Sequence, residues 1–143
     1  MPYMNDMQLD SAIKITRPLA IHLLALAQES PEHEVCGLIG AVKHQPTTVY
    51  PIHNIAENPK IAFEMNPEDQ INALKTMRDK KEKLFAIYHS HPNSPAIPSA
   101  EDISNIGYPD AYQLIISLNT KGVLEMRAFL LTSEGLKEIS LGV

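Results

Sequence analysis

The segment LFAIYHSHPNSPAIPSAED (84–102) constrains the fold of this chain more than any other stretch. Its mostly apolar first residues predict a buried strand that ends at two histidines. Side chains alternate between the two faces of a strand, so His89 and His91 lie on one face and Ser90 on the other. Three prolines then stiffen the following loop, and Ser99 begins a short predicted helix. The loop can therefore bring helical residues back over the two histidines at little cost in entropy.

This juxtaposition predicts a metal site. Two neutral imidazoles on one strand face form a chelate that suits zinc, and Asp102, three residues after Ser99, supplies a carboxylate. Two histidines and one carboxylate are a frequent catalytic zinc set that leaves a fourth position for water. HSH alone also fits an exposed strand end, and SAED alone fits a helix start with an N-cap serine. Together, at this spacing, they predict His89, His91 and Asp102 as zinc ligands.

Hydrolysis at zinc also needs a general base that takes a proton from water and returns it to the leaving group. Glu34, in PEHEVCGLIG (31–40), is the candidate because it lies at the start of an apolar strand, where an unpaired carboxylate packs poorly. Glu32 competes with it, and the local residues favour Glu34 only in part. Cys36 could be a fourth ligand or a reactive thiol, but a free cysteine on an apolar strand is most simply a core residue.

The remaining sequence predicts a mixed α/β domain around one curved sheet. Helices are expected at 18–30, capped by Thr16, from Pro67 to about 83, capped by Asn66, and at 99–106. Strands are expected over 35–42, 47–53, 84–91, 112–118, 123–131 and 136–140, with a weakly alternating edge strand over 8–16. Residues 1–7 are expected to be flexible, and 8–143 to form a single domain.

Composition limits the function classes. The chain has 143 residues, 44% of them hydrophobic, one cysteine and a formal net charge of -5. The acidic balance argues against nucleic-acid and membrane partners, and no apolar run approaches the ~20 residues of a membrane span. A lone thiol and an N-terminus unlike a signal peptide favour a soluble, cytoplasmic protein.

These motifs resemble the JAMM (MPN+) metalloprotease family, whose pattern is a glutamate, a variable gap, H-[ST]-H, seven residues, S, two residues and D. Here the positions are Glu34, His89-Ser90-His91, Ser99 and Asp102, and every one of them matches the family pattern. The likeness runs from about residue 12 to the end and is closest to the compact bacterial and archaeal members. It implies a cytidine-deaminase-like α+β fold, with a curved, mostly antiparallel sheet flanked by two main helices and a short one after the metal loop.

The resemblance also implies roles for the motif residues. His89, His91 and Asp102 would bind one Zn²⁺ per chain. Glu34, now preferred to Glu32, would act as general base and then protonate the leaving amine. Ser99 would donate a hydrogen bond to the oxyanion.

The substrate implied by the resemblance is the C-terminal Gly-Gly tail of a ubiquitin-like sulfur-carrier protein, with release of cysteine from a carrier–cysteine adduct. Removal of such modifiers from lysines, or trimming of a carrier precursor, is the alternative. A RadC-like DNA-associated protein is a weaker alternative, because the resemblance to that group covers only residues 89–102. An inactive scaffold is also weaker, because inactive relatives lack motif residues that this chain has. A glycine tail could add as a strand near 54–66. A homodimer is compatible with the sequence.

Overall fold

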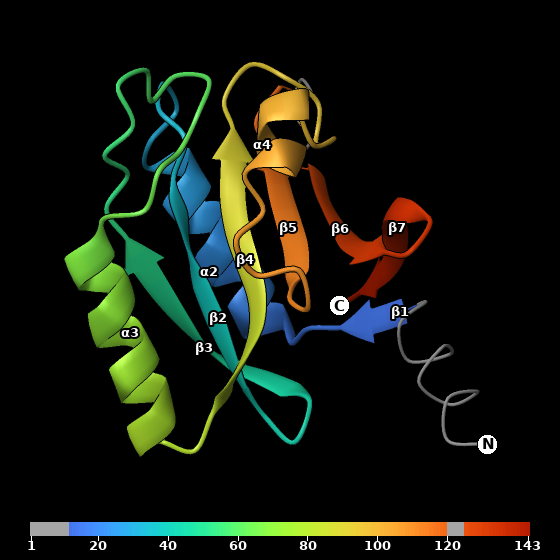
Figure 1. The fold of residues 1–143 in the computed structure, drawn as a ribbon. Coiled ribbons are helices and arrows are strands. Elements are labelled where there is room, and N and C mark those ends of the chain that lie inside the picture. Colours follow the sequence, from blue (N-terminus) through green and yellow to red (C-terminus); the bar gives the residue numbers. More distant parts are fainter. Residues whose placement is uncertain (1–11, 120–124) are drawn as a thin grey trace.

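One seven-stranded mixed sheet forms the centre of the molecule, with strand order β1-β7-β6-β5-β4-β2-β3 (Figure 1). The computed structural model describes residues 12–119 and 125–143. The strands are β1 (Ala12–Lys14), β2 (Cys36–Val42), β3 (Gln45–Ile52), β4 (Lys83–His91), β5 (Tyr112–Ser117), β6 (Glu125–Thr132) and β7 (Gly135–Gly142). The pairs β1–β7 and β4–β5 are parallel and the other pairs antiparallel. The predicted mixed, mostly antiparallel sheet is confirmed.

Each of the three helices in the described residues begins at a predicted cap. They are α2 (Arg17–Gln28), α3 (Pro67–Asp79) and α4 (Ala100–Ser104). The side chain of Thr16 accepts a hydrogen bond from the Leu19 amide at 3.3 Å, and that of Asn66 accepts one from the Asp69 amide at 3.0 Å. These bonds satisfy amides that have no partner inside the helix.

The helices cover opposite faces of the sheet, with α2 behind it and α3 and α4 in front in Figure 1. The larger core cluster packs α2 against alternate residues of the sheet, among them Tyr88 and Leu114. A second cluster lies under α3 and includes Ile87 of β4. Because strand residues alternate, His89 and His91 share the α3 face with Ile87.

The buried faces of two helices differ from the prediction. The helical spacing of Ile71, Leu74 and Met77 predicts one apolar face, but Ile71 is 57% exposed, and Ala73 and Met77 are the buried residues of α3. The residues of α2 are apolar almost all round, which predicts a buried helix, but Ile21 is 57% exposed and His22 is exposed. Both helices lie on the outside of the sheet, so only one side of each contacts it, and apolar content alone does not identify that side.

Part of the N-terminal prediction lies outside the described residues. The edge strand is confirmed for Ala12–Lys14, at the end of the sheet beside β7. The first residues of that predicted strand, the flexible segment 1–7 and the boundary at residue 8 fall in the part not described. Within 12–119 and 125–143, no helix has the length and apolar character needed to cross a membrane.

Gly37 should be essential to this packing. A methyl group at position 37 would overlap the Tyr50 carbonyl oxygen and the Tyr88 ring. Gly37→Ala is expected to lower the free energy of unfolding by about 1–3 kcal/mol or more, because the backbone of a central strand cannot move away. The matched control is Gly107→Ala, where a methyl would meet nothing within 4 Å. Urea unfolding of both variants tests this, and equal midpoints would contradict it.

Candidate metal centre

The candidate metal centre lies at the C-terminal end of β4. His89 and His91 are 2% and 3% exposed, because β4 lies between antiparallel β2 and parallel β5. His89 is paired with Cys36 on one side and Ile115 on the other. The predicted strand geometry is confirmed, and it fixes both imidazoles in the protein interior.

Ser90, between the two histidines, faces the other side and anchors the segment before β2. Its hydroxyl accepts a hydrogen bond from the Val35 amide at 2.8 Å, and its own amide donates to the Val35 carbonyl at 3.0 Å. Val35 is thereby tied to β4 next to the histidines. Apart from the side-chain alternation, no sequence pattern indicates this role of Ser90.

Asp102 reaches the histidines from the first turn of α4. A capping box forms there: the Ser99 hydroxyl accepts from the Asp102 amide at 3.0 Å, and the Ser99 amide donates to Asp102 Oδ2 at 2.9 Å. The interaction holds the carboxylate in one orientation, with its side chain only 10% exposed. Local helix capping and the candidate metal site therefore use the same atoms.

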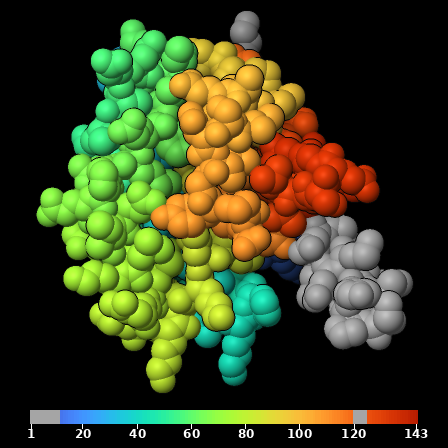
Figure 2. Space-filling model, viewed as in Figure 1, coloured from blue at the N-terminus to red at the C-terminus, as the bar shows by residue number. Residues whose placement is uncertain are grey.

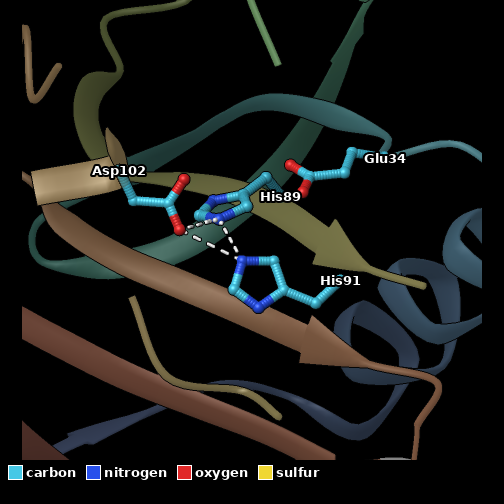
Figure 3. Close-up of side chains that lie close together, drawn as sticks. All are labelled: Glu34, His89, His91 and Asp102. Atoms are coloured by element: carbon cyan, nitrogen blue, oxygen red, sulfur yellow. Dashed lines mark hydrogen bonds and ion pairs between the residues drawn. The ribbon is translucent and has the colours of Figure 1, made fainter. Parts of the chain in front are cut away.

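Three predicted ligand atoms converge on one point (Figure 3). Asp102 Oδ2 lies 3.2 Å from His89 Nε2 and 3.1 Å from His91 Nε2, and the two Nε2 atoms are 3.1 Å apart. With zinc bonds of about 2.0–2.1 Å, tetrahedral ligand atoms would lie roughly 3.3 Å apart. With Glu34 included, all four groups offer ligand atoms within 4.8 Å of one another. This spacing suits a single zinc ion.

The hydrogen bonds behind the cluster favour a cation as well. His91 Nδ1 donates to the Pro95 carbonyl at 2.7 Å, which leaves the lone pair of a neutral imidazole on Nε2, facing the Asp102 carboxylate. Two lone pairs at this distance repel unless a proton or a metal ion lies between them. Burial disfavours the charged forms of Asp102 and His91. Their mutual hydrogen bond and charge attraction nevertheless lower the pKa of Asp102 and raise that of His91. Without a metal, a proton fills this role, and zinc would replace it.

His89 is held by packing rather than by a second hydrogen bond. Its Nδ1 is buried and has no hydrogen-bond partner among the described residues. The ring of Phe63 stacks on its imidazole with centroids 4.5 Å apart. Burial lowers the pKa of His89, which favours the neutral form that a metal requires. Phe63 is a further residue of the site whose role sequence reasoning did not identify.

Glu34 lies beside the cluster in the protein interior. The residue is 4% exposed, and its Oε1 has no hydrogen-bond partner in the described part of the chain. Burial raises the pKa of Glu34 to about 8, and the Asp102 charge adds to this effect, whereas His91 opposes it. A buried carboxyl group next to a candidate zinc site is suited to accept and return protons.

Other candidates from the sequence lie elsewhere. Glu32 is exposed, and His33, His44 and His53 are exposed as well and outside the four-residue group. Cys36 is buried, with its thiol directed to the Ile52 carbonyl at 3.4 Å, and burial raises its pKa to about 12. A thiol of this kind is a core residue and a poor nucleophile, which agrees with the interpretation favoured from the sequence.

A cavity of about 810 Å³ opens onto the centre. His89 and Asp102 line it between two walls, the segment 55–65 and the segment from α4 to Tyr108. Figure 2 shows these two segments side by side on the front of the molecule. The arrangement gives an extended substrate access to the candidate metal ligands.

Comparison with protein families identifies one match. The sequence profile described as prokaryotic homologs of the JAB domain (Prok-JAB) matches residues 16–131. A desampylase of Haloferax volcanii is 28% identical over 142 residues, covering 98% of this chain and 99% of that protein. A probable TtuB-protein conjugate cleaving protease of Thermus thermophilus is 37% identical over 118 residues (82% and 73%). A CysO-cysteine peptidase of Mycobacterium tuberculosis is 24% identical over 123 residues (85% and 84%).

Solved structures share the fold. The solution structure of a protein from Desulfitobacterium hafniense has a TM-score of 0.79 at 32% identity, covering 90% of each chain. A structure entitled "JAMM: A Metalloprotease-like Zinc Site in the Proteasome and Signalosome" has a TM-score of 0.54 at 20% identity, covering 92% of this chain and 97% of the other. The latter similarity concerns the fold alone.

Zinc should stabilise the folded chain through the three converging ligands. At a free zinc concentration 100 times the dissociation constant, the gain is about 2.7 kcal/mol, seen as a higher melting temperature. His91→Ala and Asp102→Asn should lose most of this gain, whereas His22→Ala, on the exposed side of α2, should keep it. Thermal unfolding with zinc and with a chelator measures the effect. Equal zinc stabilisation of all variants would exclude these ligands.

The raised pKa of Glu34 should make metal-free stability depend on pH. A carboxyl group with a folded pKa of about 8 and an ordinary value of 4.5 is protonated when folded, so its contribution is complete below pH 4.5 and is lost as pH rises toward 8. Between pH 4.5 and 8, the free energy of unfolding of the metal-free wild type, kept in chelator, should fall by on the order of 2–4 kcal/mol relative to that of Glu34→Gln. Urea unfolding at several pH values measures the difference, and parallel curves for the two chains would contradict it.

Proposed function

Since the chain belongs to the Prok-JAB family of prokaryotic JAB-domain homologs and is a JAMM-type metallopeptidase, we propose that it hydrolyses the bond after the C-terminal Gly-Gly of a ubiquitin-like sulfur-carrier protein. The favoured reaction releases cysteine from a carrier–cysteine adduct. The observation that carries the proposal is the convergence of His89, His91 and Asp102 beside the buried Glu34, with His89 and Asp102 lining an open cavity. The proposed location is the cytoplasm, where the single thiol, Cys36, would stay reduced.

In this proposal His89 Nε2, His91 Nε2 and Asp102 Oδ2 hold one zinc ion. Bound zinc supplies Lewis acidity, which polarises a carbonyl group and lowers the pKa of water. The chain's own contribution is to hold the three ligand atoms at their observed separations of 3.1–3.2 Å. The Pro95 carbonyl and the Phe63 ring orient the two imidazoles.

Glu34 is the proposed general base. A nearby divalent cation would lower its pKa from about 8, so the carboxylate would be ionised and ready to accept a proton at neutral pH. It takes a proton from the water that attacks the glycine carbonyl and passes it to the amine as the C–N bond breaks. The products are a carrier with a free glycine carboxylate and an amine, here that of cysteine.

Ser99 is proposed to donate a hydrogen bond to the oxyanion that forms during this attack. Its hydroxyl oxygen accepts from the Asp102 amide, which leaves the hydroxyl hydrogen free to donate. The residue is exposed at the start of α4, next to the ligand carboxylate. Capping and oxyanion binding are therefore compatible in one side chain.

The segment 54–66 is the proposed contact for the carrier tail. It supplies much of one cavity wall and is closed by a β-bridge between Asn54 and Met65. A Gly-Gly tail has no side chains and can lie extended in such a cavity, with affinity from backbone hydrogen bonds. Phe63 would then contact both the tail and the imidazole of His89.

Removal of a ubiquitin-like modifier from a protein lysine is the second candidate. It is supported by the relatives named desampylase and TtuB-conjugate cleaving protease, whose identities of 28% and 37% exceed the 24% of the CysO-cysteine peptidase. The scissile carbonyl is the same in both reactions, and only the leaving amine differs. The experiment below therefore offers both kinds of bond.

Intact mass spectrometry of a carrier–cysteine adduct, incubated with the zinc-loaded protein, should show loss of one cysteine, and a chelator should prevent it. Glu34→Gln should bind zinc as the wild type does, yet turn over about 10²–10⁴-fold more slowly, because the base is missing. An isopeptide-linked carrier is tested in parallel. Cleavage of this substrate alone would support the second candidate, and cleavage of neither would reject the proposal. Loss of zinc from Glu34→Gln would make Glu34 a ligand.

A further inference from the structure

We propose that Asn54 is a positioning residue that joins the wall of the cavity to the backbone of Glu34, so that the position of the base depends on the loop that contacts the substrate. This inference rests on the base role proposed for Glu34. Asn54 lies two residues after the end of β3 and outside the four-residue centre. Its effect on the reaction would pass through Glu34 alone.

The side-chain amide of Asn54 uses its full hydrogen-bonding capacity. Nδ2 donates to the Glu34 carbonyl at 3.0 Å and to the Ala62 carbonyl at 3.1 Å. Oδ1 accepts from the amides of Ala56 and Glu64, both at 3.0 Å. An asparagine side chain has two N–H donors and two acceptor lone pairs, so all four are engaged. One side chain thus binds both arms of the loop 54–66 and the backbone of Glu34.

The backbone of Glu34 has no other support within the described residues. Its amide donates to the Pro59 carbonyl at 2.7 Å, and its carbonyl accepts from Asn54. Both polar backbone groups therefore bind the loop or the asparagine at its base. The next residue, Val35, is instead tied to Ser90 of β4. Hydrogen bonds to β4 therefore hold the backbone of Val35, whereas hydrogen bonds to the loop hold the backbone of Glu34, the proposed base.

The side chain of Glu34 cannot correct a shift of its backbone. Its buried Oε1 lacks a hydrogen-bond partner in the described ranges, so the carboxylate position follows from the backbone and from packing. A displacement of about 1 Å of a catalytic group can cost on the order of 100-fold in rate. A bond that fixes the Glu34 carbonyl is thus able to affect turnover.

The same loop forms a wall of the cavity. Ile55, Ile61 and Phe63 line it, and Phe63 stacks on His89. A substrate that contacts this wall would hold the loop in place, and Asn54 would transmit that restraint to Glu34. Asn54 thereby links substrate contact to the geometry of the base.

Asn54→Asp tests the link with a minimal change. The carboxylate keeps acceptors for the Ala56 and Glu64 amides, but it loses both donors and faces the Glu34 and Ala62 carbonyls. We expect kcat to fall on the order of 10- to 100-fold, by a larger factor than any rise in KM, with unchanged zinc content. The matched control is Asn72→Asp, an exposed residue of α3, which should retain wild-type kinetics. A rise in KM alone would overturn the proposal, since it would assign Asn54 to substrate binding.

A double variant shows whether the effect passes through Glu34. In the Glu34→Gln background, adding Asn54→Asp should reduce the residual rate far less than it does in the wild type, because the base is already absent. The same fold loss in both backgrounds would show an effect independent of Glu34 and overturn the proposal. If Asn54→Asp does not fold, Asn54→Ser, which also lacks the donor pair, replaces it in every measurement.

Amide hydrogen exchange provides a readout that does not depend on the substrate. Asn54→Asp should accelerate exchange of the Glu34 amide, bound to Pro59, and leave that of Ser90, bound to Val35, unchanged. If the wild type cleaves no carrier bond, the proposed function fails and this measurement alone decides the inference. Unchanged protection of Glu34 would then overturn it, and a loss confined to Glu34 and the loop would support it.

Discussion

The pairing of β4 with β2 and β5 is the constraint on which the rest of the site depends. It buries His89 and His91 on one face and turns Ser90 to the other, where it holds Val35. The parallel pairing with β5 requires a crossover, and that crossover carries the stiff proline loop and α4 back across the strand ends. One strand register therefore places the ligands, the carboxylate of Asp102 and the segment bearing Glu34.

Electrostatics within this site are unfavourable without a cation. The buried carboxyl group of Glu34, the partly buried one of Asp102 and two buried imidazoles lie close together, and burial raises the pKa of Glu34 to about 8. The contact between Asp102 and His91 needs a proton or a metal ion between the two groups, because the Nδ1–H of His91 already donates to the Pro95 carbonyl. Such an arrangement lowers stability, and a metal ion bound there would link metal binding to folding.

The loop between β3 and α3 connects substrate access to the chemistry. It forms a wall of the cavity, stacks Phe63 on His89 and binds both backbone groups of Glu34 through Asn54 and Pro59. A loop of this kind can vary in its outer residues and so alter substrate choice, while its inner hydrogen bonds keep the base in place.

The amino-acid sequence by itself determined the strand before HSH, the helix caps at Thr16, Asn66 and Ser99, and the spacing of the metal motif, because these depend on local periodicity and nearby hydrogen bonds. The placement of Glu34, 55 residues before His89, rested on the resemblance to a family. Tertiary structure alone decided that Ile71 is exposed, that Phe63 stacks on His89 and that Asn54 holds the Glu34 carbonyl. These features arise from packing between segments distant in the chain, which no local pattern encodes.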